Sequence, residues 1–177
     1  MGLNIRFEFA TATRILFGSG RLDEVGLLAA EMGHHVFVVT GRTDQRAEPL
    51  VSQLKKENLE YVIFNVSGEP TTEVVLKGVE CARQSDCDMV IGIGGGSVLD
   101  TGKAVAALLT NPGDLIDHLE VVGGGKPITR VSASYIAIPT TAGTGTEVTQ
   151  NAVLISSEHV CQGESPQPTH AAAFGGY

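Results

Sequence analysis

Three features are scarce in this sequence, and each scarcity excludes a class of protein. The three cysteines, Cys81, Cys87 and Cys161, form neither a disulfide framework nor a paired CxxC metal site. Only 12 lysines and arginines stand against 20 acidic residues, a net charge of −8, which argues against nucleic acid or an anionic membrane as a partner. No apolar run is long enough to span a bilayer, and the first residues contain no signal-peptide core. We therefore expect a cytoplasmic protein with reduced thiols.

The residues that are abundant predict a globular α/β fold. Of 177 residues, 42% are hydrophobic and 18% are charged, which suits one good-sized domain with its own core. Segments with strand-like and helix-like patterns alternate along the chain. This alternation predicts a parallel sheet flanked by helices on both faces, with ligands bound at the carboxyl ends of the strands. We expect strands at 13–17, 35–40, 61–66, 88–93 and 135–138, and helices at 21–32, 44–56, 72–82 and 97–109.

A glycine-rich turn is the first candidate binding site. The stretch DMVIGIGGGSVLDTGK at 88–103 places Gly94, Gly95 and Gly96 between a predicted strand and a helix that begins at Ser97. Glycines before a helix N-terminus let a phosphate approach unpaired N–H groups, and Ser97 could cap the helix and donate to a phosphate oxygen. The pattern is neither the usual dinucleotide fingerprint nor a Walker loop. The alternative is a tight strand–helix turn that binds nothing.

A threonine-rich loop is the second candidate. The stretch IPTTAGTGTEVT at 138–149 follows another predicted strand, and Thr144 and Glu147 have the spacing of a capping box, so a helix should begin near Gly145. The hydroxyls of Thr140, Thr141 and Thr144 suit hydrogen bonding to the sugar and phosphates of a nucleotide. The alternative is an ordinary threonine-rich helix cap.

Several stretches together resemble the iron-containing (group III) alcohol dehydrogenase family. They are GGGSVLDTGKAVA at 94–106, NPGDLIDHLEVVGGG at 111–125 and AIPTTAGTGTEVT at 137–149, and RILFGSGRLDEVG at 14–26 also fits. The resemblance covers about residues 6–159. It implies that 1–159 form a Rossmann-like NAD(P)-binding domain of the dehydroquinate-synthase type. The implied activity is metal-dependent hydride transfer between a nicotinamide cofactor and a small alcohol or aldehyde.

The resemblance also implies a role for individual residues. Asp100 would lie beside the nicotinamide end and the substrate cleft, and is the one catalytic candidate. Lys103 stands where the family often has lysine, although it could equally be a solvated helix residue. The remaining cofactor-binding candidates hold the pyrophosphate, the adenosine half or the middle of the cofactor: Gly94, Gly95, Gly96, Ser97, Thr140, Thr141, Thr144 and Val153.

Two residues after a predicted strand bear on the choice of cofactor. NAD-preferring relatives tend to have aspartate where this chain has Gly41, directly after Thr40. Gly41 removes that carboxylate, and Arg42 could pair with a 2′-phosphate in a charge-assisted way. We therefore expect a preference for NADP(H) over NAD(H). The alternative is that Arg42 points into solvent.

The metal ligands of the family are expected to lie outside this chain. The family binds iron or zinc through one aspartate and three histidines placed after the nucleotide domain. The five histidines here lack the spacing of a metal site: His34, His35, His118, His159 and His170. We therefore expect that the helical metal domain is absent, that Fe²⁺ or Zn²⁺ is bound only in a full-length protein, and that the chain alone is inactive.

Two alternative functions and the state of assembly remain to be considered. A stand-alone nucleotide-binding module and a related glycerol-phosphate dehydrogenase or sugar-phosphate cyclase are the alternatives. The threonine stretch favours alcohol dehydrogenases, and Asp100 counts against maleylacetate reductases. Loss of the helical domain would expose an apolar cleft, so we expect a homo-oligomer.

The end of the sequence departs from the family. Residues 160–177 have no apolar periodicity and are expected to form an irregular, disordered tail. When the codons are read one base out of frame, the permitted letters include VKVSLRSPLMLPRL, which is close to the family pattern. The recovered segment has a lysine opposite Gln162 that contacts the cofactor in the family. We hypothesise a frameshift after about His159; the alternative is a genuine short protein with its own tail.

Sequencing the coding DNA tests the frameshift. We expect the bases after the His159 codon to spell that segment when they are read in the shifted frame. Out-of-frame codons that spell an unrelated segment would refute it.

Overall fold

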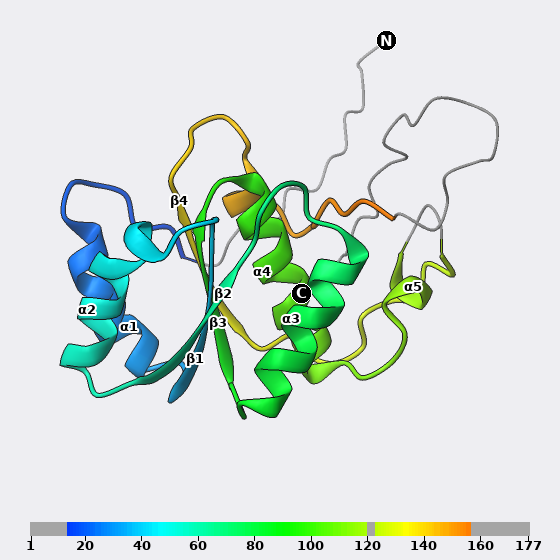
Figure 1. The fold of residues 1–177 in the computed structure, drawn as a ribbon, viewed down its shortest axis with the longest axis horizontal. Coiled ribbons are helices and arrows are strands. Elements are labelled where there is room, and N and C mark those ends of the chain that lie inside the picture. Colours follow the sequence, from blue (N-terminus) through cyan, green and yellow to red (C-terminus); the bar gives the residue numbers. More distant parts are fainter. Residues whose placement is uncertain (1–13, 120–122, 157–177) are drawn as a thin grey trace, which may run out of the picture.

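A computed structural model describes residues 14–119 and 123–156, which form a parallel four-stranded sheet between helices (Figure 1). The strands are β1 His35–Thr40, β2 Glu60–Asn65, β3 Met89–Gly94 and β4 Ser134–Pro139. Their order across the sheet is β2-β1-β3-β4, and all three neighbouring pairs are parallel. Each of these strands lies within a residue of its predicted position, so the predicted sheet is confirmed.

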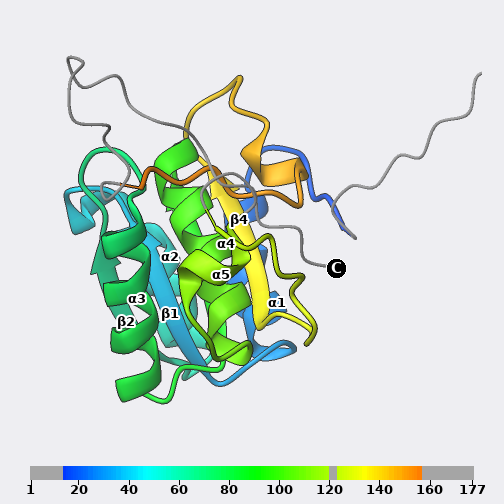
Figure 2. The same cartoon turned by 90° about the vertical axis from the view of Figure 1, so that its right-hand side faces the viewer.

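Helices cover both faces of the sheet, as the alternating pattern predicts (Figures 1 and 2). The first face carries helices α1 and α2 with the 3₁₀ turns η1 Arg21–Glu24 and η2 Asp44–Arg46. The second face carries α3 and α4. The short elements α5 and η3 lie in loops. The remaining bounds are α1 Val25–Ala30, α2 Glu48–Lys56, α3 Thr72–Gln84, α4 Gly96–Thr110, α5 Leu115–His118 and η3 Thr146–Val148.

The two central strands form the core because their side chains are buried on both faces. Alternate residues of a strand point to opposite sides, so β1 sends Val36 and Val38 toward α1 and α2 and sends Phe37 toward α3 and α4. All six residues of β3 are buried. This is the pattern of a parallel sheet covered on both faces, and it explains the continuous apolar runs of the two strands.

Asp88 closes the amino end of the sheet. Its carboxylate accepts hydrogen bonds from the backbone N–H groups of His34 and His35 at 2.9–3.0 Å. A Cβ at Gly33 would lie 2.5 Å from the same carboxylate, so only glycine allows this approach. These hydrogen bonds join Asp88, which directly precedes β3, to the start of β1.

The two long helices of the second face begin differently. Thr71 caps α3, because its hydroxyl accepts from the N–H of Val74 at 3.3 Å. The prediction that Ser97 caps α4 is wrong. Gly95 is the N-cap, Ser97 lies inside the first turn, and no side chain caps this helix.

Two further local predictions are also wrong. Residues 14–17 form no strand; Phe17 is 95% exposed, and they are paired with none of the described strands. The helix expected near Gly145 is only the single turn η3, capped by Gly145 at φ 69°, so Thr144 and Glu147 make no capping box. Residue 13 and the predicted tail at 160–177 lie outside the described residues. In the described ranges, the helices are too short or too polar to cross a membrane.

Cys87 offers a test of this core. It is buried, and burial raises its thiol pKa to about 11. On the order of one thousandth of it is thiolate at pH 8. In a Cys81→Ser, Cys161→Ser variant, a disulfide reagent should therefore label Cys87 only after unfolding in urea. The native protein should lose stability as pH rises from 9 to 11, because the folded state keeps a proton that the unfolded thiol releases. Native labelling at the rate of a free thiol would contradict the buried position.

Candidate functional site

The sheet order brings three candidate loops to one edge. β2 and β3 lie on opposite sides of β1, so the chain direction across the sheet reverses between β1 and β3. Parallel α/β sheets bind ligands at the carboxyl ends of the strands beside such a reversal. Gly41 follows β1, Gly95 follows β3 and Thr140 follows β4. The residues predicted from three separate stretches therefore lie along one edge of the sheet.

The glycine turn and the threonine loop are in direct contact. The N–H of Thr140 donates to the carbonyl oxygen of Gly94 at 2.8 Å. A Cβ at Gly95 would lie 3.2 Å from Thr141 Oγ1, and one at Gly96 would lie 3.3 Å from Thr144 Cγ2. Larger residues at either glycine would therefore push the loop away. Gly94 has a separate role, since a Cβ there would lie 2.7 Å from Val98 and open the tight turn.

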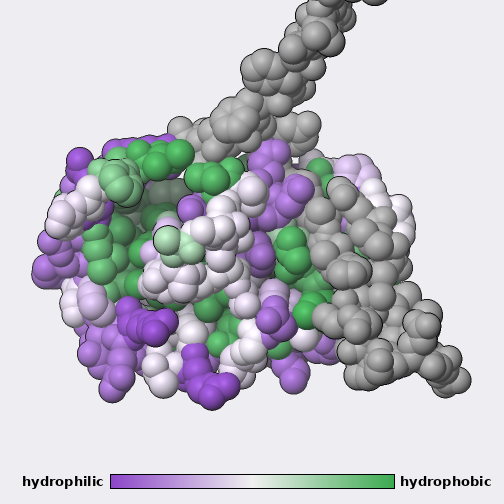
Figure 3. All heavy atoms as spheres, turned by 90° about the horizontal axis from the view of Figure 1, so that it is seen from above, coloured by the Kyte–Doolittle hydropathy of each residue, from purple (hydrophilic) through white to green (hydrophobic). Residues whose placement is uncertain are grey.

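This edge has the properties of an anion site. The first turn of α4 carries N–H groups without intrahelical acceptors, together with the positive end of the helix dipole. No side chain caps that turn. Thr140, Thr141 and Thr144 are exposed beside it. Seen from above, the molecule is hollowed, with hydrophobic walls in the hollow and residues of intermediate hydropathy beside it (Figure 3). Val153, the last of the candidates, is half exposed.

The turn after β1 carries both signs of charge. Arg42 is exposed, and a Cβ at Gly41 would meet no atom within 4 Å. Asn65, at the end of β2, donates to the carbonyl of Gly41 at 3.0 Å and to the Asp44 carboxylate at 2.7 Å. The sequence interpretation did not include Asp44 or Asn65, because they meet only when β1 and β2 pair.

Asp100 and Lys103 form a buried pair one turn further along α4. The side chain of Asp100 is 9% exposed and that of Lys103 is 12% exposed, and Nζ lies 3.6 Å from Asp100 Oδ1. Burial raises the pKa of Asp100, while the Lys103 ammonium and the Val153 N–H oppose the shift. Burial lowers the pKa of Lys103, while Asp100 and Glu147 oppose that shift. The suggestion that Lys103 is a solvated helix residue is wrong. Its partners lie in the segment that follows β4, which no local pattern could reveal.

Tyr135 explains why glycine occupies positions 92 and 102. Its hydroxyl donates to the carbonyl of Leu99 at 2.9 Å, and burial raises its pKa, so that it stays protonated. A Cβ at Gly92 would lie 2.6 Å from this hydroxyl, and one at Gly102 would lie 2.9 Å from the ring. Gly92, which opens the glycine stretch, is therefore a packing residue between β3, β4 and α4.

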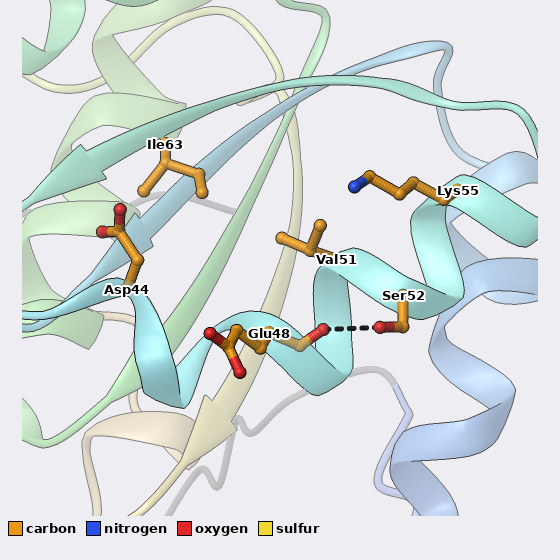
Figure 4. A pocket seen from close by; sticks show the side chains of 6 residues that line it. All are labelled: Asp44, Glu48, Val51, Ser52, Lys55 and Ile63. Atoms are coloured by element: carbon orange, nitrogen blue, oxygen red, sulfur yellow. Dashed lines mark hydrogen bonds between the residues drawn. The ribbon is translucent and has the colours of Figure 1, made fainter.

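A shallow pocket lies between α2 and β2, and Asp44 of the turn after β1 belongs to its lining (Figure 4). Its lining includes the carboxylates of Asp44 and Glu48 and the ammonium of Lys55, and Ser52 donates to the Glu48 carbonyl at 2.9 Å. It shares no residue with the glycine turn or the threonine loop. Its mixed charges and open position give it no evident chemistry. In the ranges 14–119 and 123–156, His, Cys, Asp and Glu residues form no group of three that could hold a metal ion.

The chain belongs to the iron-containing alcohol dehydrogenase family, whose model matches residues 12–169. It is 33% identical to choline dehydrogenase of Bacillus subtilis over 97% of this chain and 46% of that protein. It is 31% identical to NADH-dependent butanol dehydrogenase A of Clostridium acetobutylicum, over 87% of this chain and 40% of that protein.

A solved structure shows the same fold. The sulfoacetaldehyde reductase of Bifidobacterium kashiwanohense in complex with NAD⁺ superposes with a TM-score of 0.79, at 27% identity, over 97% of this chain and 43% of that one. The fold is therefore that of the N-terminal domain of the family. The chain spans less than half the length of these proteins. The family match also extends past His159, where the motif resemblance ended.

A double-mutant cycle tests the packing role of Gly92. Gly92→Ala should destabilise the chain by about 1–3 kcal/mol, because its methyl group would overlap the Tyr135 hydroxyl. In a Tyr135→Phe background the same change should cost markedly less, a coupling of about 1 kcal/mol or more measured by urea unfolding. Gly41→Ala, where a Cβ meets nothing, is the matched control and should show no coupling. Equal costs in both backgrounds would contradict the assignment.

Proposed function

We propose that the carboxyl edge of this sheet binds a nicotinamide dinucleotide, and that the chain is the cofactor domain of a metal-dependent alcohol dehydrogenase. The observation that carries the proposal is the contact between the uncapped glycine turn of α4 and the threonine loop. Family membership supports it, as does the related reductase whose solved structure contains NAD⁺.

Each candidate residue has a physical role in this proposal. The N–H groups of Gly95, Gly96 and Ser97 receive the pyrophosphate, because glycine allows close approach and the helix dipole favours negative charge. Gly94 keeps the turn tight. The hydroxyls of Thr140, Thr141 and Thr144 bond the sugar and phosphate oxygens, and the exposed side of Val153 contacts the middle of the cofactor. The bound nicotinamide supplies the hydride chemistry.

Asp100 is proposed as the residue of this chain nearest the reacting end. Its carboxylate lies one turn into α4, beneath the glycine turn, and is held by Lys103. It is too buried to meet a substrate directly in the described structure, where only 7% of the residue is exposed. We therefore assign it an electrostatic role rather than a proton-transfer role.

Turnover requires groups that the described residues do not provide. They contain no cluster that could hold iron or zinc, so no catalytic step is assigned to a metal in this chain. We infer that the 177-residue polypeptide binds cofactor without oxidising an alcohol. The family match favours the alcohol dehydrogenase assignment over a glycerol-phosphate dehydrogenase or sugar-phosphate cyclase. The relatives are named for different substrates, choline and butanol among them, so family membership does not identify the alcohol.

We further propose that the cofactor is NADP(H) rather than NAD(H). Gly41 leaves an open space after β1, and exposed Arg42 can pair with a 2′-phosphate. The Asp44 carboxylate is the opposing feature. Its hydrogen bond to Asn65 fixes it at the same turn, where it could repel a phosphate or accept from a ribose hydroxyl.

Fluorescence titration of the purified chain with NADPH and NADH tests both proposals. NADPH should bind more tightly, and Arg42→Ala should weaken NADPH alone by about tenfold or more, the loss of one charge-assisted contact. Gly41→Asp should favour NADH without loss of stability, because its Cβ has open space. Asp44→Asn should tighten NADPH binding if that carboxylate repels the phosphate.

Different outcomes would contradict different parts of this proposal. Absence of binding to either cofactor would refute the dinucleotide site. Tighter binding of NADH would refute the preference alone. Oxidation of an alcohol by the chain with added Fe²⁺ or Zn²⁺ would refute the inference that it lacks turnover.

A further inference from the structure

The ammonium of Lys103 donates to four acceptors in the described structure. It lies in the second turn of α4, and its Nζ donates to the carbonyl oxygens of Thr146 at 2.8 Å, Thr149 at 3.0 Å and Asn151, and to Thr149 Oγ1 at 3.0 Å. Three N–H donors thus serve four acceptors. All four belong to one short segment, residues 146–151, which includes the end of the threonine loop.

The acceptors around Lys103 also stabilise its positive charge. An ammonium ion is strongly hydrated, so a lysine side chain only 12% exposed must have its water replaced by polar atoms. Backbone carbonyls supply most of that replacement, and the Asp100 carboxylate lies 3.6 Å away. Asp100 Oδ1 and Glu147 Oε2 are buried and accept no hydrogen bond from the described residues. Both carboxylates therefore face the charge of this lysine, and the N–H of Val153 also stabilises that of Asp100.

The same segment has a second anchor beyond Asn151. The N–H of Ile155 donates to the carbonyl of Pro70 at 2.9 Å, and the carbonyl of Ile155 accepts from the N–H of Thr72 at 3.0 Å. Between the two anchors Ala152 and Leu154 are buried, whereas Val153 is half exposed. The direction of Val153 is therefore set by a backbone fixed at both ends, and Lys103 is the fixed point on the side of the threonine loop.

The first acceptor stands close to the proposed pyrophosphate site. Thr146 is two residues after Thr144, whose methyl group lies over Gly96, and only Gly145 with its left-handed φ separates them. A shift of Thr146 would therefore move Thr144 relative to the glycine turn. Lys103 and Gly96 lie on the same helix, so the lysine holds the loop to the element that carries the glycines.

We propose that Lys103 is a positioning residue for the dinucleotide site, which holds the threonine loop and Val153 in register with the glycine turn without touching the cofactor itself. This role rests on the proposed function above. It predicts that the charge of Lys103, and not only its bulk, determines cofactor affinity.

Three variants test this role. Lys103→Met should weaken dinucleotide binding at least tenfold and speed amide hydrogen exchange in residues 144–155, while β1 and β3 keep their protection. Thr149→Val removes one of the four acceptors of the ammonium. It should weaken binding by only about two- to tenfold, because three acceptors remain for the three N–H donors. Lys77→Met is the matched control, because Lys77 is exposed on α3. It should change neither measurement.

Charge is tested by pH and by a conservative variant. Burial lowers the pKa of Lys103 below its ordinary value of 10.5, so wild-type affinity should fall as pH rises through that lowered pKa and the ammonium loses its proton. The carboxylates of Asp100 and Glu147 face this ammonium and oppose the loss of its proton. Tyr135 lies beside Asp100. Lys103→Arg should recover part of the affinity and should remove this alkaline loss, because a guanidinium stays charged.

The outcomes separate this role from a purely structural one and from the proposed function. Wild-type affinity in Lys103→Met, or equal loss of protection in 144–155 and in β1 and β3, would overturn the positioning role. If Lys103→Met does not fold, unchanged affinity in Thr149→Val would overturn it. If the wild type binds neither NADPH nor NADH, the proposed function fails and this role with it. Hydrogen exchange would still show whether Lys103 fixes the segment.

Discussion

The parallel pairing of β3 with β1 on one side and β4 on the other is the constraint on which the site depends. Parallel strands end at the same edge of a sheet, so this pairing places the residues after β1, β3 and β4 side by side. The pairing also positions the loops. The carbonyl of Gly94, the last residue of β3, accepts a hydrogen bond from the N–H of Thr140, the first residue after β4. The candidate residues lie in loops and in the first turns of α4, but the sheet determines the order of these elements.

Packing between the layers keeps that edge in place. Tyr135 reaches from β4 under α4 to the carbonyl of Leu99, and the absence of side chains at Gly92 and Gly102 makes room for it. At the opposite end, Asp88 binds the backbone before β1. One end of the sheet is thus closed by the hydrogen bonds of the exposed Asp88 carboxylate, and loops lie at the other end.

The sequence was sufficient for the parallel sheet and its main helices, and it named the loops that the structure brings to one edge of the sheet. Continuous apolar runs identified β1 and β3, and the glycines after β3 identified the start of α4, because these signals depend on neighbours in the chain. The helix cap was missed because Ser97 is a good cap by residue type, whereas the backbone turns at Gly95. The family motifs located the threonine loop, but they did not show that its methyl and hydroxyl groups rest on the glycines.

Contacts between distant residues explain the rest of what was missed. Lys103 meets acceptors 43 to 48 residues further along the chain, in a segment with no periodic pattern. Asn65 and Asp44 meet only because β2 lies beside β1. The apolar residues at 14–17 had strand-like composition, but composition cannot supply a neighbouring strand with which to pair. Each failure concerns a partner that local sequence cannot specify.

The open space at Gly41 has a consequence for how such a protein can change over generations. A side chain added there meets nothing, and the hydrogen bond from Asn65 uses a backbone carbonyl that every residue has. The position can therefore accept new residues without disturbing the fold, unlike Gly33, Gly92 or Gly94, which are confined by their neighbours. If cofactor preference depends on this residue, a lineage could exchange one dinucleotide for the other by a single substitution that selection for stability would not oppose.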